Sequence, residues 1–120
     1  MAFKVKSFAT LRMSVSNIQK SRDWIKEILE IEPIEDLENF VSFKMGNTSL
    51  DIALADPKSP VSTGGSVGYW FVDNLGEAIA KAKRLGGQVY RGPLRVHEIG
   101  RTIVQIKDPN GNVIGLEGEF

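Results

Sequence analysis

The sequence predicts an α+β fold built from two similar modules, each a mixed four-stranded sheet with one helix. Amphipathic helical periodicity occurs in only two stretches, whereas period-2 alternation recurs in short segments along the chain. The order strand, helix, further strands occurs on both sides of a linker, which indicates an internal repeat. Two helices are too few to connect every pair of strands in a parallel sheet, so mixed sheets fit the pattern better.

The first module is expected to span residues 7–55 of a single domain, residues 1–120. Its first strand is predicted over residues 9–15, where apolar and polar side chains alternate. Two more strands, 39–45 and 48–55, flank a Gly-Asn dipeptide that is typical of a hairpin turn.

A helix is predicted between the first strand and this hairpin. Ser16 and Gln19 have the spacing of a capping box, and Pro33 prevents a longer helix. The apolar residues that recur at helical spacing are Ile18, Trp24, Ile25, Ile28 and Leu29.

The second module, residues 66–118, follows a Pro/Ser/Gly-rich linker at 56–65. It begins with a predicted strand at 66–72. Asn74 with Glu77 then has the spacing of a helix N-cap. After this second helix, which ends at two consecutive glycines, we expect a short strand at 88–90 and a loop at 91–100.

The tail is predicted to be a β-hairpin. A tight turn is predicted at Asp108-Pro109-Asn110-Gly111. Proline presets φ, Asn and Gly tolerate positive φ, and the aspartate side chain can accept hydrogen bonds from the turn amides. Apolar residues alternate on both sides of the turn, Val104 and Ile106 before it and Ile114 and Leu116 after it.

The two modules align with one residue-number offset at their first strands and a larger one at their last strands. Thr10 aligns with Ser66, an offset of 66 − 10 = 56, and Asp51 aligns with Gly115, an offset of 115 − 51 = 64. The second module therefore carries about eight extra residues, which are expected in loop 91–100.

Composition excludes several classes of function. The formal net charge is zero, so nothing in the charge balance suggests binding to nucleic acid or to an anionic membrane surface. The absence of cysteine excludes disulfides, thiolate metal sites and a cysteine nucleophile. No apolar run reaches transmembrane length and no signal core is present, so a cytoplasmic location is expected.

Several landmarks together resemble the vicinal oxygen chelate superfamily, which includes glyoxalase I, bleomycin-resistance proteins, fosfomycin-resistance enzymes and extradiol dioxygenases. They are the Ser21-x-x-Trp24-Ile25-x-x-x-Leu29 helix, the end of the second helix at Ala82–Gly87, and the Asp-Pro-x-Gly-Asn hairpin that begins at Asp108. The resemblance covers nearly the whole chain. It implies paired βαβββ modules whose mixed sheets form a cup, the glyoxalase/bleomycin-resistance fold.

The same resemblance locates four metal-ligand positions at Thr10, Asp51, Ser66 and Gly115. One carboxylate, two hydroxyls and a glycine are a poor donor set for a divalent ion. We therefore predict no metal and no cofactor. The chain is similar to the metal-free branch, in which a cup binds a small organic molecule, for example to sequester a drug or metabolite.

Ligand contacts are predicted from Arg12, Asp51, Trp70 and Glu117, which period-2 counting directs into the cup. In one interpretation Trp70 stacks on a planar group and the charges orient the ligand. In the other, Arg12 pairs with Asp51 or Glu117 and the cup is simply filled.

No catalytic residue is assigned, and whether the protein is an enzyme stays open. The alternative function is a lyase or isomerase related to lactoylglutathione lyase, with Asp51, Glu117 or the single histidine, His97, as acid or base. A third hypothesis is an accessory domain with a closed cup. The expected partners are a small-molecule ligand and a second copy of the chain in a homodimer, as the resemblance implies, with no nucleic acid and no membrane.

Overall fold

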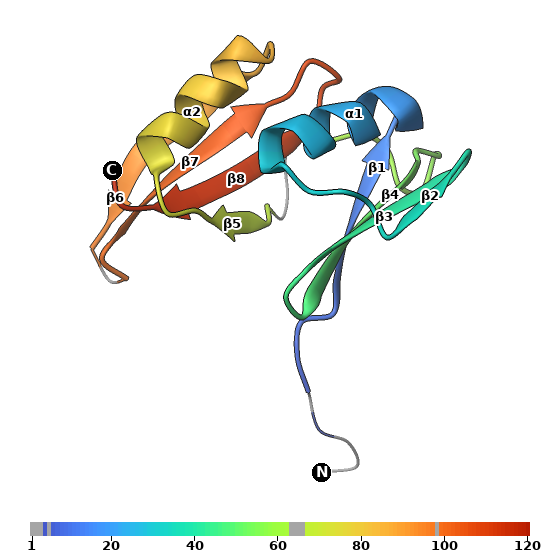
Figure 1. Cartoon of the computed structure of the whole chain (residues 1–120), viewed down its shortest axis with the longest axis horizontal. Helices are drawn as coiled ribbons and strands as arrows, with labels where there is room; N and C mark the ends of the chain where they lie inside the picture. The colour runs from blue at the N-terminus through green and yellow to red at the C-terminus, as the bar shows by residue number, and fades with distance from the viewer. Residues whose placement is uncertain (1–3, 5, 63–66, 98) are drawn as a thin grey trace.

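The computed structural model describes residue 4 and residues 6–62, 67–97 and 99–120. In this part of the chain two helices and two four-stranded mixed sheets follow the order β1–α1–β2–β3–β4 and β5–α2–β6–β7–β8 (Figure 1). The fold is therefore α+β, as predicted. The elements are β1 (Thr10–Val15), α1 (Ile18–Leu29), β2 (Glu35–Leu37), β3 (Phe40–Met45), β4 (Thr48–Leu54), β5 (Tyr69–Phe71), α2 (Leu75–Arg84), β6 (Gln88–Val96), β7 (Arg101–Lys107) and β8 (Val113–Gly118).

The two sheets have the same topology. The first has the strand order β1-β4-β3-β2 and the second has the order β5-β8-β7-β6. In each sheet the first strand of the module lies parallel to the last one, and the other neighbours are antiparallel. The internal repeat inferred from the sequence is thus present in the structure as two sheets with the same strand order and directions.

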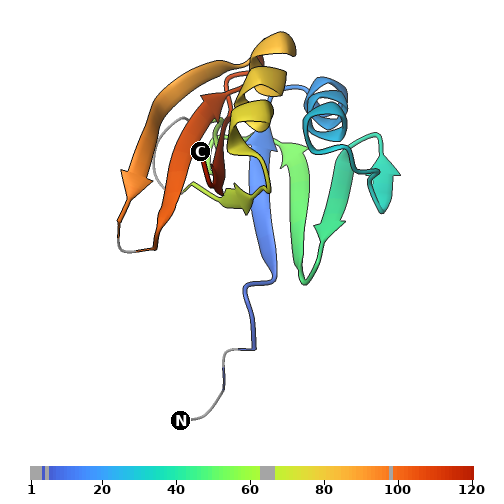
Figure 2. The same ribbon diagram turned by 60° about the vertical axis from the view of Figure 1, so that its left-hand side comes forward.

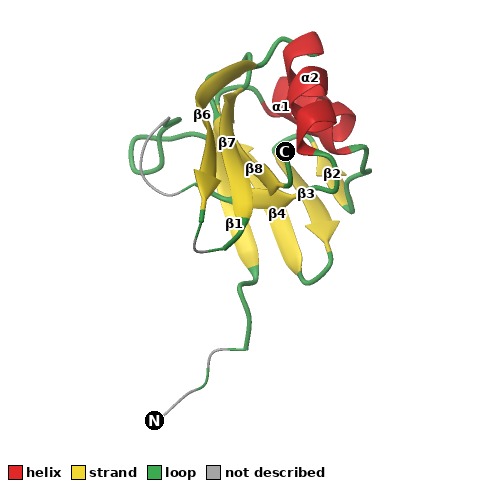
Figure 3. Cartoon of the chain, turned by 90° about the vertical axis from the view of Figure 1, so that its left-hand side faces the viewer, coloured by secondary structure: helices red, strands yellow, loops and turns green. Residues whose placement is uncertain are grey.

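The helices of the two modules lie together on one side of the molecule (Figure 3). Lys81 on α2 forms an ion pair of 3.1 Å with Glu30, which caps the C-terminus of α1. Between β1 and β5, the Leu11 side chain packs directly against the backbone of Gly68, so a Cβ at position 68 would displace it. One core of buried side chains continues from the first module into the second.

The helix-facing sides of both sheets contribute to this common core. Val41, Leu50 and Ile52 are fully buried beneath α1, and Val104 and Leu116 are buried in the second sheet. Because side chains alternate along a strand, the opposite face of each sheet is directed away from the helices. We call these two faces the outer faces. Figure 2 shows the sheets side by side, with the N-terminal segment leading away from them.

The predicted hairpin turn is confirmed. The Asp108 side chain accepts hydrogen bonds from the backbone amides of Asn110 at 2.8 Å and Asn112 at 2.9 Å. Asp108 is buried, and burial raises the pKa of its carboxyl group, although the amide hydrogen bonds act in the opposite direction.

Three local predictions were wrong. The N-cap of α1 is Asn17, not Ser16, and its side chain accepts from the Lys20 amide at 3.0 Å. Most of the predicted loop 91–100 belongs to β6, whose register shifts between Val89 and Leu94. The position of the third strand expected in the first module after the helix was missed: this strand is the short edge strand β2, whose three residues are all exposed and show no alternation.

The repeat offset in the first strands is 57 rather than 56. The N-caps of the helices are Asn17 and Asn74, which differ by 74 − 17 = 57. Arg12 pairs with Asp51 in the first sheet as Tyr69 pairs with Gly115 in the second. A slip of one residue moves every side chain of a strand to the other face, so this correction changes the predicted site. Ser66 itself lies outside the described residues.

No helix among the described residues is long and apolar enough to cross a membrane.

Candidate functional site

The corrected register moves one of the four metal-ligand positions. With an offset of 57, the counterpart of Thr10 is Val67 rather than Ser66. The donor set becomes one hydroxyl, one carboxylate, one isopropyl group and one glycine, which do not fit a divalent ion. Within the described ranges, no group of three or more His, Asp or Glu side chains is arranged to hold a metal.

A tyrosine ring occupies the space of the fourth ligand position. A Cβ on Gly115 would lie 2.7 Å from Cγ of Tyr69 and 2.8 Å from the carbonyl oxygen of Gly68. The Tyr69 hydroxyl accepts a hydrogen bond of 2.8 Å from Nε2 of Gln105, which keeps the ring over the glycine. Position 115 therefore has no room for a glutamate or histidine side chain unless the tyrosine moves.

The outer face of the first sheet brings together Arg12, Asp51 and Ser42. Arg12 and Asp51 are direct neighbours across the β1–β4 pair, and Ser42 is the neighbour of Asp51 on β3. The Ser42 hydroxyl donates a 2.6 Å hydrogen bond to Oδ1 of Asp51. This bond orients the half-buried carboxylate and leaves its second oxygen available.

The predicted ion pair of Arg12 with Asp51 or Glu117 is not formed. Arg12 is exposed and has no carboxylate partner within the described part of the chain. It lines a small cavity of about 170 Å³ with Ser14 of β1, Pro60 of the linker and Val113 of β8. Its guanidinium is therefore free to pair with an added anion.

Glu117 lies on the outer face of the other sheet. Its Oε2 accepts from Nη1 of Arg101 at 2.8 Å, and the guanidinium of Arg101 also lies 4.1 Å from the centre of the Phe71 ring. The Glu117 side chain is one-fifth exposed, and its ion pair with Arg101 already neutralises its charge. It belongs to a patch with Arg101 and Phe71, not to the Arg12 cluster of the same chain.

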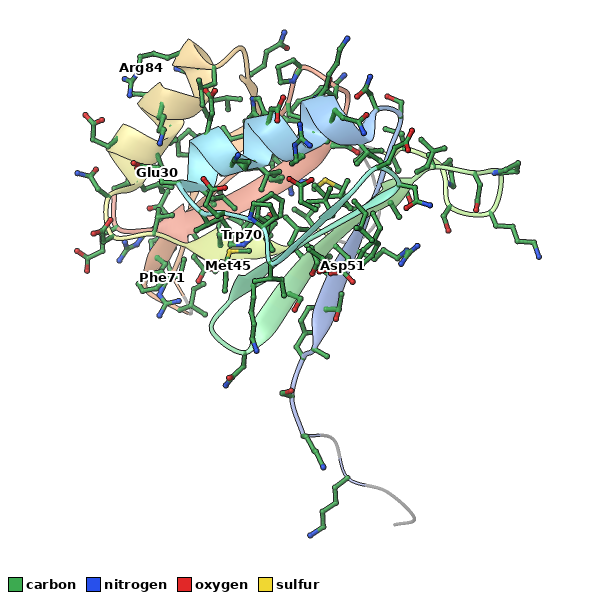
Figure 4. All side chains as sticks on the ribbon, turned by 45° about the vertical axis from the view of Figure 1, so that its right-hand side comes forward. Glu30, Met45, Asp51, Trp70, Phe71 and Arg84 are labelled. Atoms are coloured by element: carbon green, nitrogen blue, oxygen red, sulfur yellow. The ribbon has the colours of Figure 1, made fainter. Side chains whose placement is uncertain are left out.

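Trp70 was predicted to share a face with Glu117, and this orientation was wrong. Trp70 is the strand neighbour of buried Leu116, whereas Phe71 is the neighbour of Glu117. Its indole N–H donates to Sδ of Met45 at 2.8 Å, between the two sheets. Figure 4 shows Trp70 and Met45 together below α1, with Asp51 and Phe71 to either side. The cause is the one-residue slip in the predicted offset.

The remaining candidate, His97, is exposed in the turn that connects β6 and β7. Among the described residues, its side chain forms no ion pair with Asp51 or Glu117.

Sequence reasoning missed Ser42, Tyr69 and Arg101. Tyr69 would have been found if Asn17 and Asn74 had been used as equivalent N-caps, because that alignment pairs Arg12 with Tyr69. Ser42 is placed beside Asp51 by the register of β3 against β4. Arg101 had no comparable signal, because it was assigned to the end of a loop.

Comparisons with known proteins agree with this geometry. Residues 7–116 match the family model of the Glyoxalase/Bleomycin resistance protein/Dioxygenase superfamily. No curated protein is significantly similar to the chain in sequence.

Solved structures share the fold at low sequence identity. A glyoxalase/bleomycin resistance protein from Albidiferax ferrireducens T118 has a TM-score of 0.75 at 19% identity, over 93% of this chain and 98% of that one. A family enzyme from Burkholderia phytofirmans PsJN has a TM-score of 0.78 at 13% identity, also over 93% and 98%. A lactoylglutathione lyase from Agrobacterium tumefaciens has a TM-score of 0.72 at 18% identity, over 95% and 94%.

Proposed function

Because the chain belongs to the Glyoxalase/Bleomycin resistance protein/Dioxygenase superfamily, we propose that it is a member that binds a small anionic organic molecule without a metal ion. The observation that carries the proposal is that Arg12, which has no carboxylate partner among the described residues, and Asp51, which is held by Ser42, are strand neighbours on the outer face of the first sheet. The altered ligand positions, with Tyr69 packed over Gly115, support the metal-independent part.

Each side chain has a defined role in this proposal. The Arg12 guanidinium donates to a carboxylate or phosphate of the ligand, which gives a charge-assisted hydrogen bond. The second oxygen of Asp51 accepts from a hydroxyl or amine on the same ligand, while Ser42 holds the carboxylate in place. A ligand with an acid group next to a hydrogen-bond donor fits this pair best.

The protein is proposed to act as a homodimer in which the cup is completed by a second copy. The inner faces of the two sheets share one core, so the outer faces of one chain are directed apart. Several large apolar side chains lie exposed on these faces, namely Leu37, Phe71 and Leu94. Pairing the first sheet of one chain with the second sheet of its partner would bury them and bring Glu117 opposite Arg12.

A second candidate function is a lyase or isomerase, favoured by the geometry of Asp51. A carboxylate fixed by one hydrogen bond, with an open second oxygen beside a guanidinium, is arranged to accept a proton from a bound acid. If the protein is such an enzyme, Asp51→Asn abolishes turnover but keeps ligand binding. If it is a binding protein without catalysis, the wild type shows no turnover of the bound molecule.

The test begins with mass spectrometry of small molecules that co-purify with the native protein. The proposal expects an anionic molecule that is retained by the wild type and lost from Arg12→Ala. Isothermal titration of the identified molecule should then show weaker binding to Arg12→Ala by ~1.5–3 kcal/mol, the range for a hydrogen bond to a charged group. Arg95→Ala, which removes a guanidinium from the opposite face of the second sheet, is the matched control. Equal affinities for Arg12→Ala and the wild type would reject the assignment.

A further inference from the structure

A second cavity lies where the two sheets meet, and its lining includes none of Arg12, Asp51 and Ser42. Its volume is about 500 Å³, within the range of small-molecule sites. Its walls come from both modules, with Leu11, Met45 and Leu50 on one side and Trp70 on the other. No Asp, Glu, Lys, Arg or His is among the described residues that line it.

The polar groups of this cavity are few, and the strongest donor has a weak partner. The indole N–H of Trp70 donates only to Sδ of Met45, at 2.8 Å. A thioether sulfur is a poor acceptor compared with a carbonyl or ether oxygen. Methionine is also flexible and polarisable, so Met45 can move aside when a better acceptor arrives.

We propose that this inter-sheet cavity binds an uncharged, planar aromatic molecule through a single oxygen acceptor that replaces Met45 as the partner of Trp70. The aromatic walls favour a flat ring system, and the absence of charged lining residues disfavours an ion. The site differs from the proposed anion site, because none of Arg12, Asp51 and Ser42 lines it. It also gives Trp70 a binding role that differs from the one expected in the cup.

The probe for the test is 6-propionyl-2-(dimethylamino)naphthalene, an uncharged naphthalene ketone whose emission shifts to the blue in an apolar site. Titration into the wild-type protein should give a saturable blue shift. Trp70→Phe keeps an aromatic ring but removes the N–H, so binding should weaken about fivefold, as for the loss of one hydrogen bond. Met45→Leu removes the competing acceptor and leaves the indole N–H unpaired before binding. Binding to this variant should become tighter.

Trp24→Phe is the matched control. Trp24 is buried and does not line the cavity, and its indole N–H has no hydrogen-bond partner within the described part of the chain. This variant should bind the probe as the wild type does. Circular dichroism checks that each variant is folded.

The proposal is overturned if the probe shows no saturable binding to the wild type. It is also overturned if Trp70→Phe and Met45→Leu, both folded, bind the probe with wild-type affinity, because the probe would then occupy another apolar surface. Loss of probe binding as the protein concentration rises would mean that a second copy of the chain covers the cavity, and this too would reject a ligand site.

Discussion

Gly115 occupies the last of the four positions at which the family resemblance implies metal ligands. Its Cα faces the Tyr69 ring so closely that any side chain would collide with the ring and with the Gly68 carbonyl. The sequence alone showed that position 115 has no side chain that could bind a metal ion. It did not show that a tyrosine fills the space, because that depends on the register of β5 against β8.

Gly115→Ala is therefore expected to destabilise the protein by ~1–3 kcal/mol, as overpacking does in a close-packed site. Gly76→Ala is the control, because a Cβ there would have its nearest neighbours at 3.8 Å and helix α2 favours alanine. Urea denaturation measures both. A Gly115→Ala variant as stable as Gly76→Ala would show that Tyr69 is not fixed over position 115.

Asp108 is predicted to make stability depend on pH. Burial raises its pKa in the folded protein, so the folded state holds the proton over a range of pH in which the unfolded chain has released it. This contribution to stability is present at low pH and is lost as the pH rises through the folded pKa.

Asp108→Asn keeps the side-chain oxygen that accepts from the turn amides but removes the titration. The wild type should gain stability relative to Asp108→Asn as the pH falls from about 7 toward about 4, near the ordinary pKa of aspartate. Thermal unfolding at several pH values measures the difference. A difference that moves in favour of the variant on acidification would mean that the amide hydrogen bonds outweigh burial.

Among the elements, the helices and the tail hairpin were predictable, because their signals are local. The predicted apolar stripe of α1 and its end before Pro33 agree with the helix found over Ile18–Leu29. The cap was misplaced by one residue, since Ser16 and Asn17 are both good N-cap residues and only the backbone geometry separates them.

Substitutions at these two neighbours test the cap. Asn17→Ala should cost ~1 kcal/mol of stability, because the Lys20 amide loses its acceptor. Ser16→Ala should change stability by less than ~0.5 kcal/mol, as for an exposed residue without a structural hydrogen bond. Chemical denaturation that showed the larger loss for Ser16→Ala would support the capping box read from the sequence.

The continuation of β6 beyond residue 90 and the position of β2 were missed, and both depend on non-local pairing. A glycine and a proline at positions 92 and 93 interrupt the alternation of β6, which pairs only with β7 at the sheet edge and tolerates them through register shifts. The other missed strand, β2, is a short, charged edge that pairs with β3 alone. Edge strands of this kind are defined by their partner and not by their own pattern.

For the whole molecule, the repeat and the family landmarks predicted the fold, but not how the modules are joined. The joint between them is formed by the inner faces, through Leu11 with Gly68 and Trp70 with Met45. No local pattern encodes which faces of two sheets meet. The predicted site therefore mixed residues of both outer faces with Trp70 from the inner one.

The homodimer is the prediction that belongs to this scale. Light scattering should give twice the 13.3 kDa chain mass at micromolar concentration. Leu94→Lys places a charge on the outer face of the second sheet and should give the monomer mass. Phe120→Lys changes an exposed residue beside α2 and should leave the dimer intact. A wild-type protein that stays monomeric would contradict the composite cup.

The central claim is that this superfamily member binds its ligand without a metal ion. Native mass spectrometry of the protein, before and after exhaustive dialysis against a chelator, tests it most directly. We predict that the same small organic molecule stays bound after chelation to the wild type and is missing from Arg12→Ala. Loss of the ligand together with a near-stoichiometric divalent ion on chelation, and its return when the ion is restored, would contradict the claim.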